Sequence, residues 1–275
     1  GEMSRIQGTA DYHFGEYHEA IKAFGSYLKD NAEPAPRRDA LYMLGMSYYR
    51  TGVYSQVPVT LGEVTANKDA LTQNAYLHMG LAYKNKARMA FEQAAASDAD
   101  LKIKEQASYN NALCIHETSY SAFGESVTVF ENFLNEFPNS AYADKVSSYL
   151  IEVYMNTRSY DAALKSIERI THPGRAILEA KQKILFQLGT QSFANTQFEQ
   201  AIGCFNQSIA LGGYNLQTKA DALYWRGESY YRLNRMQEAA RNFNDYLSLT
   251  PQKNTEMYAL AYYNLAYIAF HKKDY

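Results

Sequence analysis

The sequence predicts an all-α protein built from repeated helix hairpins, and two observations carry this prediction. The first is composition: 47% of the 275 residues are apolar and 20% are charged, with only 6 Pro and 15 Gly, which favours helices over disorder or a turn-rich β protein. The second is a recurring segment. The stretch "GEYHEAIKAF" from Gly15 returns as "FEQAIGCF" from Phe198 and "MQEAARNF" from Met236. A fixed period of this kind is the sequence signature of a repeat architecture.

The recurring segment predicts the second helix of each hairpin. It holds a small residue followed four positions later by a large apolar one, and in chain order the pairs are Ala20/Phe24, Val57/Leu61, Ala87/Phe91, Ser126/Phe130, Ala163/Ile167, Ala201/Phe205 and Ala239/Phe243. The small members are separated by 37, 30, 39, 37, 38 and 38 residues. A spacing of four places both members on one face of a helix.

A second pattern, apolar-x-x-apolar-Gly-x-x-Tyr, lies upstream of most of these pairs and predicts the first helix. It is clearest at Leu41, Leu44, Gly45 and Tyr48, and it recurs at Tyr76, Met79, Gly80, Tyr83 and, with Arg at one apolar position, at Leu223, Arg226, Gly227, Tyr230. The spacing is that of an amphipathic helix. Short turns such as "RTGVY", "NTRSY" and "RLNRM" join the two helices, because Gly52 or an Asn can adopt the left-handed conformation that ends a helix.

The glycines of the first helices need a packing reason, since a mid-helix Gly costs about 1 kcal/mol relative to Ala. They are Gly45, Gly80, Gly189 and Gly227. Where two helices cross closely, a small residue on one leaves room for a large side chain of the other. We therefore expect Phe24, Phe205 and Phe243 of the second helices to fill these spaces.

These patterns resemble the tetratricopeptide repeat, in which a W-x2-L-G-x2-Y helix is followed by an A-x3-F helix and a proline. Pro138 and Pro251 stand where that family has its closing proline. The resemblance covers nearly the whole chain and implies seven hairpins plus the first helix of an eighth, forming one superhelical α-α solenoid over residues 1–275. The spacing exceeds the usual 34 residues, and the copies at 147–170 and around 109–117 are degenerate.

One repeat is too short. Gly and the small residue of the next helix are 12 positions apart in four repeats, but only 7 separate Gly80 from Ala87. Either two helices fuse in "GLAYKNKARMAF", or about five residues after Tyr83 are missing from the sequence. We favour the second alternative, because a fused helix would have to stack its two faces on both neighbours.

Composition and motifs argue against several functions. The net charge of −2, without a Lys/Arg cluster, argues against nucleic acid. No apolar run reaches the ~18 residues of a membrane span. "HETSY" at His116 and "HEAIK" at His18 fail to complete a zinc-protease motif, and no nucleotide-binding or hydrolase motif occurs. Cys114 and Cys204 are expected to be small buried residues. We therefore expect no catalysis, no metal and no cofactor.

The expected function is the binding of a protein or peptide by a non-catalytic scaffold. In the resembled family the first helices line a concave surface, and Tyr, Phe and Arg are residue types that dominate protein recognition. The candidate partner-binding residues lie on the helical face next to the core pattern. They are Tyr42, Met46, Tyr49, Arg50, Phe186, Phe193, Tyr224, Glu228, Tyr231, Arg232, Tyr263, Tyr267 and Phe270.

Two alternatives stay open: a helical array associated with a cell-wall or glycan-processing enzyme, and a self-assembling structural array. The segment 130–145, "FENFLNEFPNSAYADK", is similar to repeat linkers of bacterial cell-envelope members of the family. It suggests the periplasm or envelope, with the cytoplasm as the alternative. The segment also has a purely structural explanation, in which Phe133 and Leu134 are core, Pro138 ends a helix and Ser140 caps the next. We further expect the chain to be a fragment of a longer protein, with a sticky last helix capable of self-association.

Overall fold

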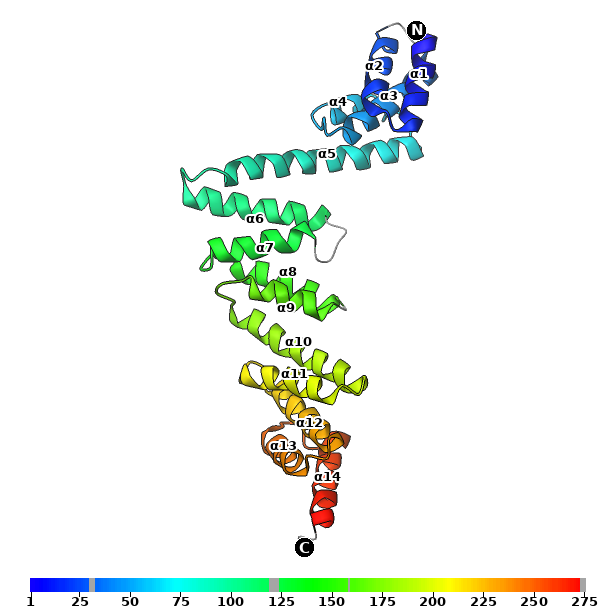
Figure 1. Cartoon of the computed structure of the whole chain (residues 1–275). Coiled ribbons are helices and arrows are strands. Elements are labelled where there is room, and N and C mark those ends of the chain that lie inside the picture. Colours follow the sequence, from blue (N-terminus) through cyan, green and yellow to red (C-terminus); the bar gives the residue numbers. More distant parts are fainter. Residues whose placement is uncertain (30–32, 119–123, 158, 273–275) are drawn as a thin grey trace. The chain divides into compact units, whose positions relative to one another are not determined.

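The computed structural model describes residues 1–29, 33–118, 124–157 and 159–272, and all regular elements within them are α-helices (Figure 1). The all-α prediction is thus confirmed. The chain divides into two compact units, 1–118 and 119–275. Residues 273–275, which belong to the predicted eighth repeat, lie outside the described part. The prediction of one array over residues 1–275 stays a prediction.

Unit 1 contains six helices in its described residues. Their bounds are α1 Glu2–Phe14, α2 Tyr17–Tyr27, α3 Pro34–Arg50, α4 Val57–Gly62, α5 Ala70–Ala95 and α6 Leu101–Thr118. Each helix packs on the next, and α3 also contacts α1 and α5. The first helices of successive hairpins are therefore neighbours, as in a stack of helix pairs.

Unit 2 contains eight helices in its described residues. They are α7 Glu125–Glu136, α8 Ala143–Asn156, α9 Tyr160–Glu168, α10 Arg175–Ala194, α11 Phe198–Ala210, α12 Leu216–Arg232, α13 Met236–Leu249 and α14 Glu256–Lys272. The first helix α10 contacts both α8 and α12, while α11 is held between α10 and α12. Successive helices run back and forth through the unit (Figure 1).

The recurring pairs form the core of both units. Six of the seven pairs are buried, with Ala20, Phe24, Ala201, Phe205 and Phe243 fully inaccessible. The exception is Ala87/Phe91, which is only half-buried. The periodicity in the sequence therefore identified the core of six repeats.

The predicted close approach of Gly to an aromatic ring is confirmed at Gly189 and Gly227. A methyl group added at Gly189 would lie 2.5 Å from Cε1 of Phe205, and one at Gly227 would lie 3.0 Å from the same atom of Phe243. Gly8 stands in the same relation to Phe24, at 2.9 Å, and Gly45 to Leu61, at 2.4 Å. In all four repeats the glycine and the large side chain are 16 residues apart, so one geometry recurs.

Gly80 is the exception, because no atom outside its own helix backbone and chain neighbours comes within 4 Å of an added methyl group. The helix α5 runs unbroken through this position for 26 residues. The chain as given thus has the fused helix, and the alternative of missing residues stays a prediction. Neither Pro nor a left-handed residue interrupts the segment, and α5 contacts both α4 and α6, so one helix does serve two neighbours.

Two of the three turns behave as their sequences predict, whereas in "NTRSY" Asn156 is the last residue of α8 and is not left-handed. Gly52 has φ +76°, and Asn234 has φ +58°. Both are in the left-handed region that ends a helix and that Gly and Asn adopt most readily. Arg158 of "NTRSY" lies outside the described residues.

The linker-like segment 130–145 packs as expected, except that Ser140 does not cap α8, whose N-cap residue is Tyr142 without a side-chain cap hydrogen bond. Phe133 and Leu134 are buried, and α7 ends before Pro138. The Oγ of Ser140 accepts a hydrogen bond from the backbone N–H of Tyr142 at 3.0 Å, just ahead of α8. Packing therefore explains this segment without reference to a cellular compartment.

A buried polar cluster ties three helices of unit 2 together. Glu131 of α7 is 2% exposed, and its carboxylate accepts hydrogen bonds from Arg169 Nε at 2.7 Å and Nη2 at 2.8 Å. It also accepts one from the Ser166 hydroxyl of α9, which in turn hydrogen-bonds the Tyr154 hydroxyl of α8 at 2.6 Å. Burial raises the pKa of Tyr154 to about 12. The charge of Glu131 is thus matched by a cation whose own side chain reaches solvent.

Candidate protein-binding face

The predicted candidates lie on first helices, as their spacing requires. Those of α3 belong to unit 1, and those of α10, α12 and α14 belong to unit 2. The two groups are therefore described separately.

On α3, tyrosines bridge to the next first helix, α5. The Tyr42 hydroxyl donates a hydrogen bond to Asn74 Oδ1 at 3.0 Å, and burial raises the pKa of Tyr42. The Tyr49 ring meets His78 edge-on at 5.0 Å between centroids. Both tyrosines are half-buried, whereas the neighbouring Arg50 is exposed.

On α12, Glu228 connects two first helices. Its Oε1 accepts hydrogen bonds from the Tyr224 hydroxyl at 3.2 Å and from Asn264 Nδ2 of α14. Burial is the largest cause of a raised pKa at Tyr224, and the Glu228 carboxylate adds to it. Tyr224 therefore remains protonated and donates to Glu228 throughout the physiological pH range.

The next turn of α12 repeats this bridge with aromatic rings. Tyr231 meets Tyr267 of α14 edge-on with centroids 6.1 Å apart, and Tyr267 in turn contacts His271, with the rings tilted and their centroids 4.3 Å apart. Burial, followed by Tyr267, raises the pKa of Tyr231. The next residue of α12, Arg232, is exposed.

Two candidates are not available to a partner. Met46 and Tyr224 are each 4% exposed, because Met46 is packed within unit 1 and Tyr224 is in the cluster around Phe243. Phe186 and Phe193 of α10 are half-buried, with Phe186 against Phe205 and Phe193 against Trp225. A helical face next to the core is predicted to be exposed, but a large ring on that face is covered wherever it packs against the next repeat.

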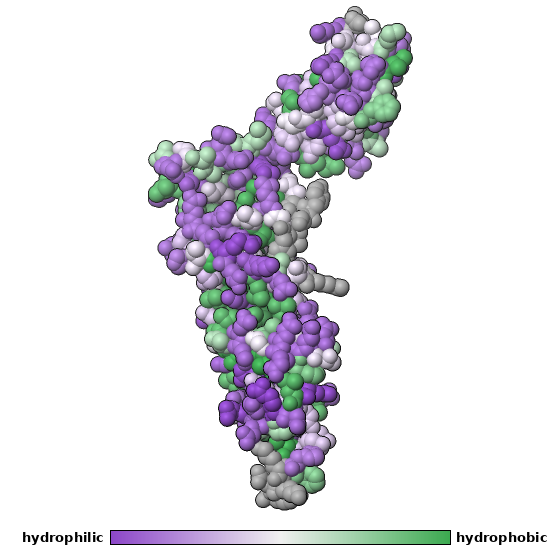
Figure 2. Space-filling view, viewed as in Figure 1, coloured by the Kyte–Doolittle hydropathy of each residue, from purple (hydrophilic) through white to green (hydrophobic). Residues whose placement is uncertain are grey.

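Among the aromatic candidates, those on the last helix are the most accessible. Tyr263 is 65% exposed, Phe270 61% and Tyr267 39%. Figure 2 shows hydrophobic residues scattered among hydrophilic ones on the visible face of each unit.

A recurring aromatic pair escaped our reading of the sequence. The residue four positions after the first-helix glycine meets the residue nine positions after it, edge to face across the turn: Tyr12/Tyr17 at 5.9 Å, Tyr49/Tyr54 at 5.8 Å and Phe193/Phe198 at 5.3 Å. Edge-to-face pairs add about 0.5–1.5 kcal/mol beyond burial. The fixed offsets from glycine were a signal that could have revealed it. Tyr49 and Phe193 are therefore packing residues as well as candidates for recognition.

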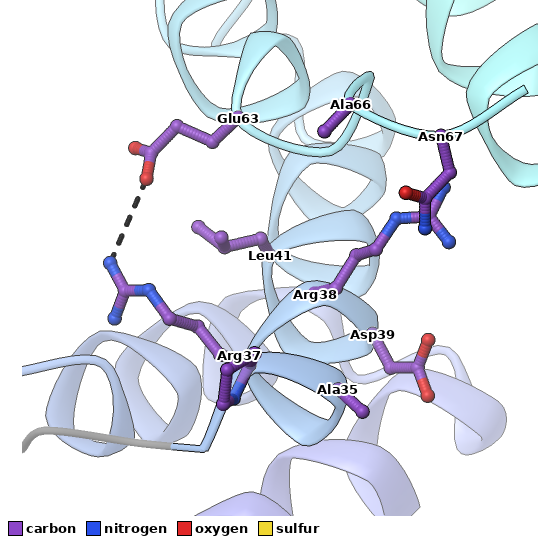
Figure 3. A pocket seen from close by; sticks show the side chains of 9 residues that line it. Ala35, Arg37, Arg38, Asp39, Leu41, Glu63, Ala66 and Asn67 are labelled. Carbon is purple, nitrogen blue, oxygen red and sulfur yellow. Dashed lines mark ion pairs between the residues drawn. The ribbon is translucent and has the colours of Figure 1, made fainter.

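Unit 1 also contains a pocket of about 540 Å³ that no sequence motif predicts (Figure 3). Leu41 lies between two polar sides: Arg37 and Glu63 face each other at 3.6 Å, and Arg38 extends toward Asn67. Arg38 holds Asp69, which lies outside the lining, through two 2.8 Å hydrogen bonds. The guanidinium of Arg38 is thus occupied structurally and is not a free anion-binding group.

Other kinds of site find little support in the described residues. No group of three or more His, Cys, Asp or Glu side chains there is arranged to hold a metal ion. None of the helices described combines the length and apolar character of a membrane span. Cys114 and Cys204 are half-buried rather than buried and form no disulfide, and burial raises the pKa of both thiols.

Stacked helix hairpins with aromatic and Arg side chains on the first helices define an α-helical repeat scaffold. A family model described as "Tetratricopeptide repeat" matches residues 7–55 and 186–254, one segment in each unit. These two segments of the chain thus match the tetratricopeptide repeat. The chain is similar to the peroxisomal targeting signal receptor of Eremothecium gossypii, with 25% identity over 301 aligned positions covering 96% of this chain and 50% of the relative. The chain thus spans about half the length of that curated relative.

Proposed function

We propose that this chain is a non-catalytic adaptor that binds a segment of another protein along the exposed side of its first helices. The repeat family and a relative named as a signal receptor support a protein-binding role. The observation that carries the finer proposal is that Arg50 and Arg232 occupy the same place in their repeats, five residues after Gly45 and Gly227. Both are exposed and follow a half-buried aromatic residue.

The chemistry favours an extended segment with carbonyl or carboxylate groups. An exposed guanidinium can donate several hydrogen bonds to such acceptors. The adjoining rings of Tyr231 and Tyr267 offer contact area whose orientation is already fixed by packing, which lowers the entropic cost of binding.

The test compares wild-type protein with an Arg50→Ala, Arg232→Ala variant in affinity capture from lysate of the source organism, followed by arrays of peptides from the captured protein. The matched control is Arg241→Ala, because Arg241 is exposed on the second helix α13. We expect capture to be lost with the double variant and kept with the control. Equal capture by all three proteins would refute the proposed face, while retention of saccharides instead would favour an array that serves a glycan-processing enzyme.

The proposal extends to location. The similarity of residues 130–145 to envelope-protein linkers supports the bacterial periplasm or envelope, although the same residues have a packing role. Immunodetection after osmotic-shock release of the periplasm tests this. Retention of the protein with cytoplasmic markers would refute it.

A further inference from the structure

Arg226 of α12 stands at a position that is apolar in other first helices. It directly precedes the first-helix glycine, at the place of Leu44 in α3 and of Leu188 in α10. Leu44 is buried and Leu188 is half-buried, and Arg226 is half-buried as well. A cation therefore occupies a place where the repeat normally packs an aliphatic side chain.

The guanidinium of Arg226 lies between two second helices. Its Nε donates a hydrogen bond to Asn242 Oδ1 of α13 at 2.6 Å, and its Nη1 donates one to Asn206 Oδ1 of α11 at 2.7 Å. Asn242 is 4% exposed, and its Nδ2 donates to the backbone oxygen of Glu238 at 2.8 Å. Asn206, in contrast, is exposed. The guanidinium is thus fixed at its Nε in the interior and reaches the surface at its Nη1.

The charge of Arg226 lacks a counter-ion in the part of the chain that the structure describes. Its two hydrogen-bond acceptors are neutral amide oxygens, and no carboxylate there forms an ion pair with it. The charge of Asp245 acts on it only from a longer distance. Burial lowers the pKa of Arg226, because removal from water disfavours the charged form. Buried charges are normally paired, so this guanidinium has the chemistry of an anion-binding group.

The remaining N–H groups of Arg226 indicate which anion fits. Those on Nη1 and Nη2 that do not bind asparagine can donate parallel hydrogen bonds to a carboxylate. The Nδ2 of the exposed Asn206 is a further donor on the same side chain that binds Nη1. One carboxylate charge balances one guanidinium, whereas Asp245 nearby disfavours the additional negative charge that a phosphate group carries.

We propose that Arg226 and Asn206 form a carboxylate-binding site on the second-helix side of unit 2, which takes an acidic side chain or the chain end of a protein partner. Arg232 is six residues further along α12 and therefore about 120° away around the helix. The site is thus separate from the face of Arg50 and Arg232, so the adaptor proposal and this one can fail independently.

The first experiment follows the side-chain Nε–H signal of Arg226 in the wild-type chain by nuclear magnetic resonance while sodium acetate replaces sodium chloride at constant ionic strength. We expect this signal to shift and to saturate, because a bound carboxylate changes the hydrogen bonding of the guanidinium. The Nε–H of Arg169 is the internal control, since it is already bound to Glu131 and should not respond. An Arg226 signal that moves no more than that of Arg169 would overturn the proposal.

The second experiment compares urea unfolding in acetate and in chloride of equal ionic strength. Acetate should stabilise wild type, as a ligand of the folded state does. Arg226→Gln removes the cation but keeps a donor for Asn242, and it should bind acetate about tenfold more weakly or worse. Lys165→Gln removes an exposed cation of the second helix α9 and should keep the wild-type response. Equal stabilisation of wild type and Arg226→Gln would show a general salt effect and refute the site.

Three further probes identify the source of the anion in the same assay. N-acetylglycine carries the carboxylate of a chain end, and the α-amide of N-acetylaspartate carries that of a side chain. Whichever stabilises wild type more at equal concentration identifies the chain end or the side chain as the ligand of Arg226. Stronger stabilisation by inorganic phosphate than by either carboxylate would contradict the assignment to a carboxylate.

Discussion

The close contact between Gly189 and Phe205 predicts an unusual response to the mildest of substitutions. In an exposed helix interior, Gly→Ala stabilises by up to about 1 kcal/mol. At Gly189, however, the new methyl group would lie 2.5, 2.7 and 2.9 Å from three ring atoms of Phe205. That ring is fully buried between α10 and α12, in a cluster with Ala201 and Ala222, so it has little room to move aside.

The expected magnitude follows from a matched pair of variants. Gly203 lies inside α11, the helix that carries Phe205, and an added methyl group there meets nothing within 4 Å. Gly203→Ala should therefore gain the full helix-propensity term. Gly189→Ala gains the same term but adds overpacking, which costs about 1–3 kcal/mol. The difference between the two variants should equal that overpacking cost.

The assay is urea unfolding followed by circular dichroism at 222 nm, with the slope of free energy against denaturant checked for constancy. A double-mutant cycle adds specificity, because Phe205→Ala removes the ring atoms that clash. Gly189→Ala should then be tolerated better in a chain that also carries Phe205→Ala than in wild type, giving a coupling energy of about 1 kcal/mol or more. If Gly189→Ala proved as stabilising as Gly203→Ala, the recurring geometry would not be a packing constraint and the reasoning would fail.

Three further predictions concern polar groups. Arg169→Met should destabilise unit 2 by about 3–5 kcal/mol because it leaves the buried Glu131 carboxylate without a counter-ion. Glu131→Gln should destabilise it less because it leaves only a half-exposed cation. Urea unfolding of both variants measures the two effects. The stability difference between wild type and Tyr154→Phe should shrink by about 1 kcal/mol between about pH 8 and pH 11. The reason is that the Tyr154 phenol ionises near pH 10 in the unfolded chain but only near pH 12 in the folded one. A constant difference would contradict the raised pKa. Hydrogen bonding from Arg38 holds the pKa of Asp69 low, so the extra free energy of unfolding of wild type over Asp69→Asn should disappear as the pH falls below about 4. Asp69→Ala also removes the α5 cap and should therefore be less stable than Asp69→Asn at about pH 7.

Much of the fold could be read from the sequence because it depends on short-range spacing. In four hairpins a glycine of the first helix precedes the large apolar residue of the second helix by 16 positions. This glycine and this large residue must meet if the chain folds into hairpins. Gly189 and Phe205 show this directly. The same reasoning failed around Gly80, because nothing in the segment after it ends a helix, and the expected turn is replaced by the continuous α5.

The candidate face was harder to predict because it depends on contacts between repeats. The pattern places Tyr224 and Glu228 on the right side of α12, but only the structure shows that Tyr224 is buried and that Glu228 binds Asn264 of the next first helix. Side chains that reach into a neighbouring repeat have no fixed spacing from their partners, since repeat length varies along the chain.

These inter-repeat contacts determine how the binding function has to be tested. Replacing Tyr49 or Tyr231 with alanine would remove a partner's contact, but it would also remove a ring that packs against His78 or Tyr267. Lost binding in such a variant would have two causes that cannot be separated. Arg50 and Arg232 directly follow these tyrosines in the sequence and are exposed, so their removal changes recognition while the stack stays intact. A loss of binding in the arginine variant with unchanged stability would therefore locate the interaction on the first helices, whereas unchanged binding would refute a role for the two arginines.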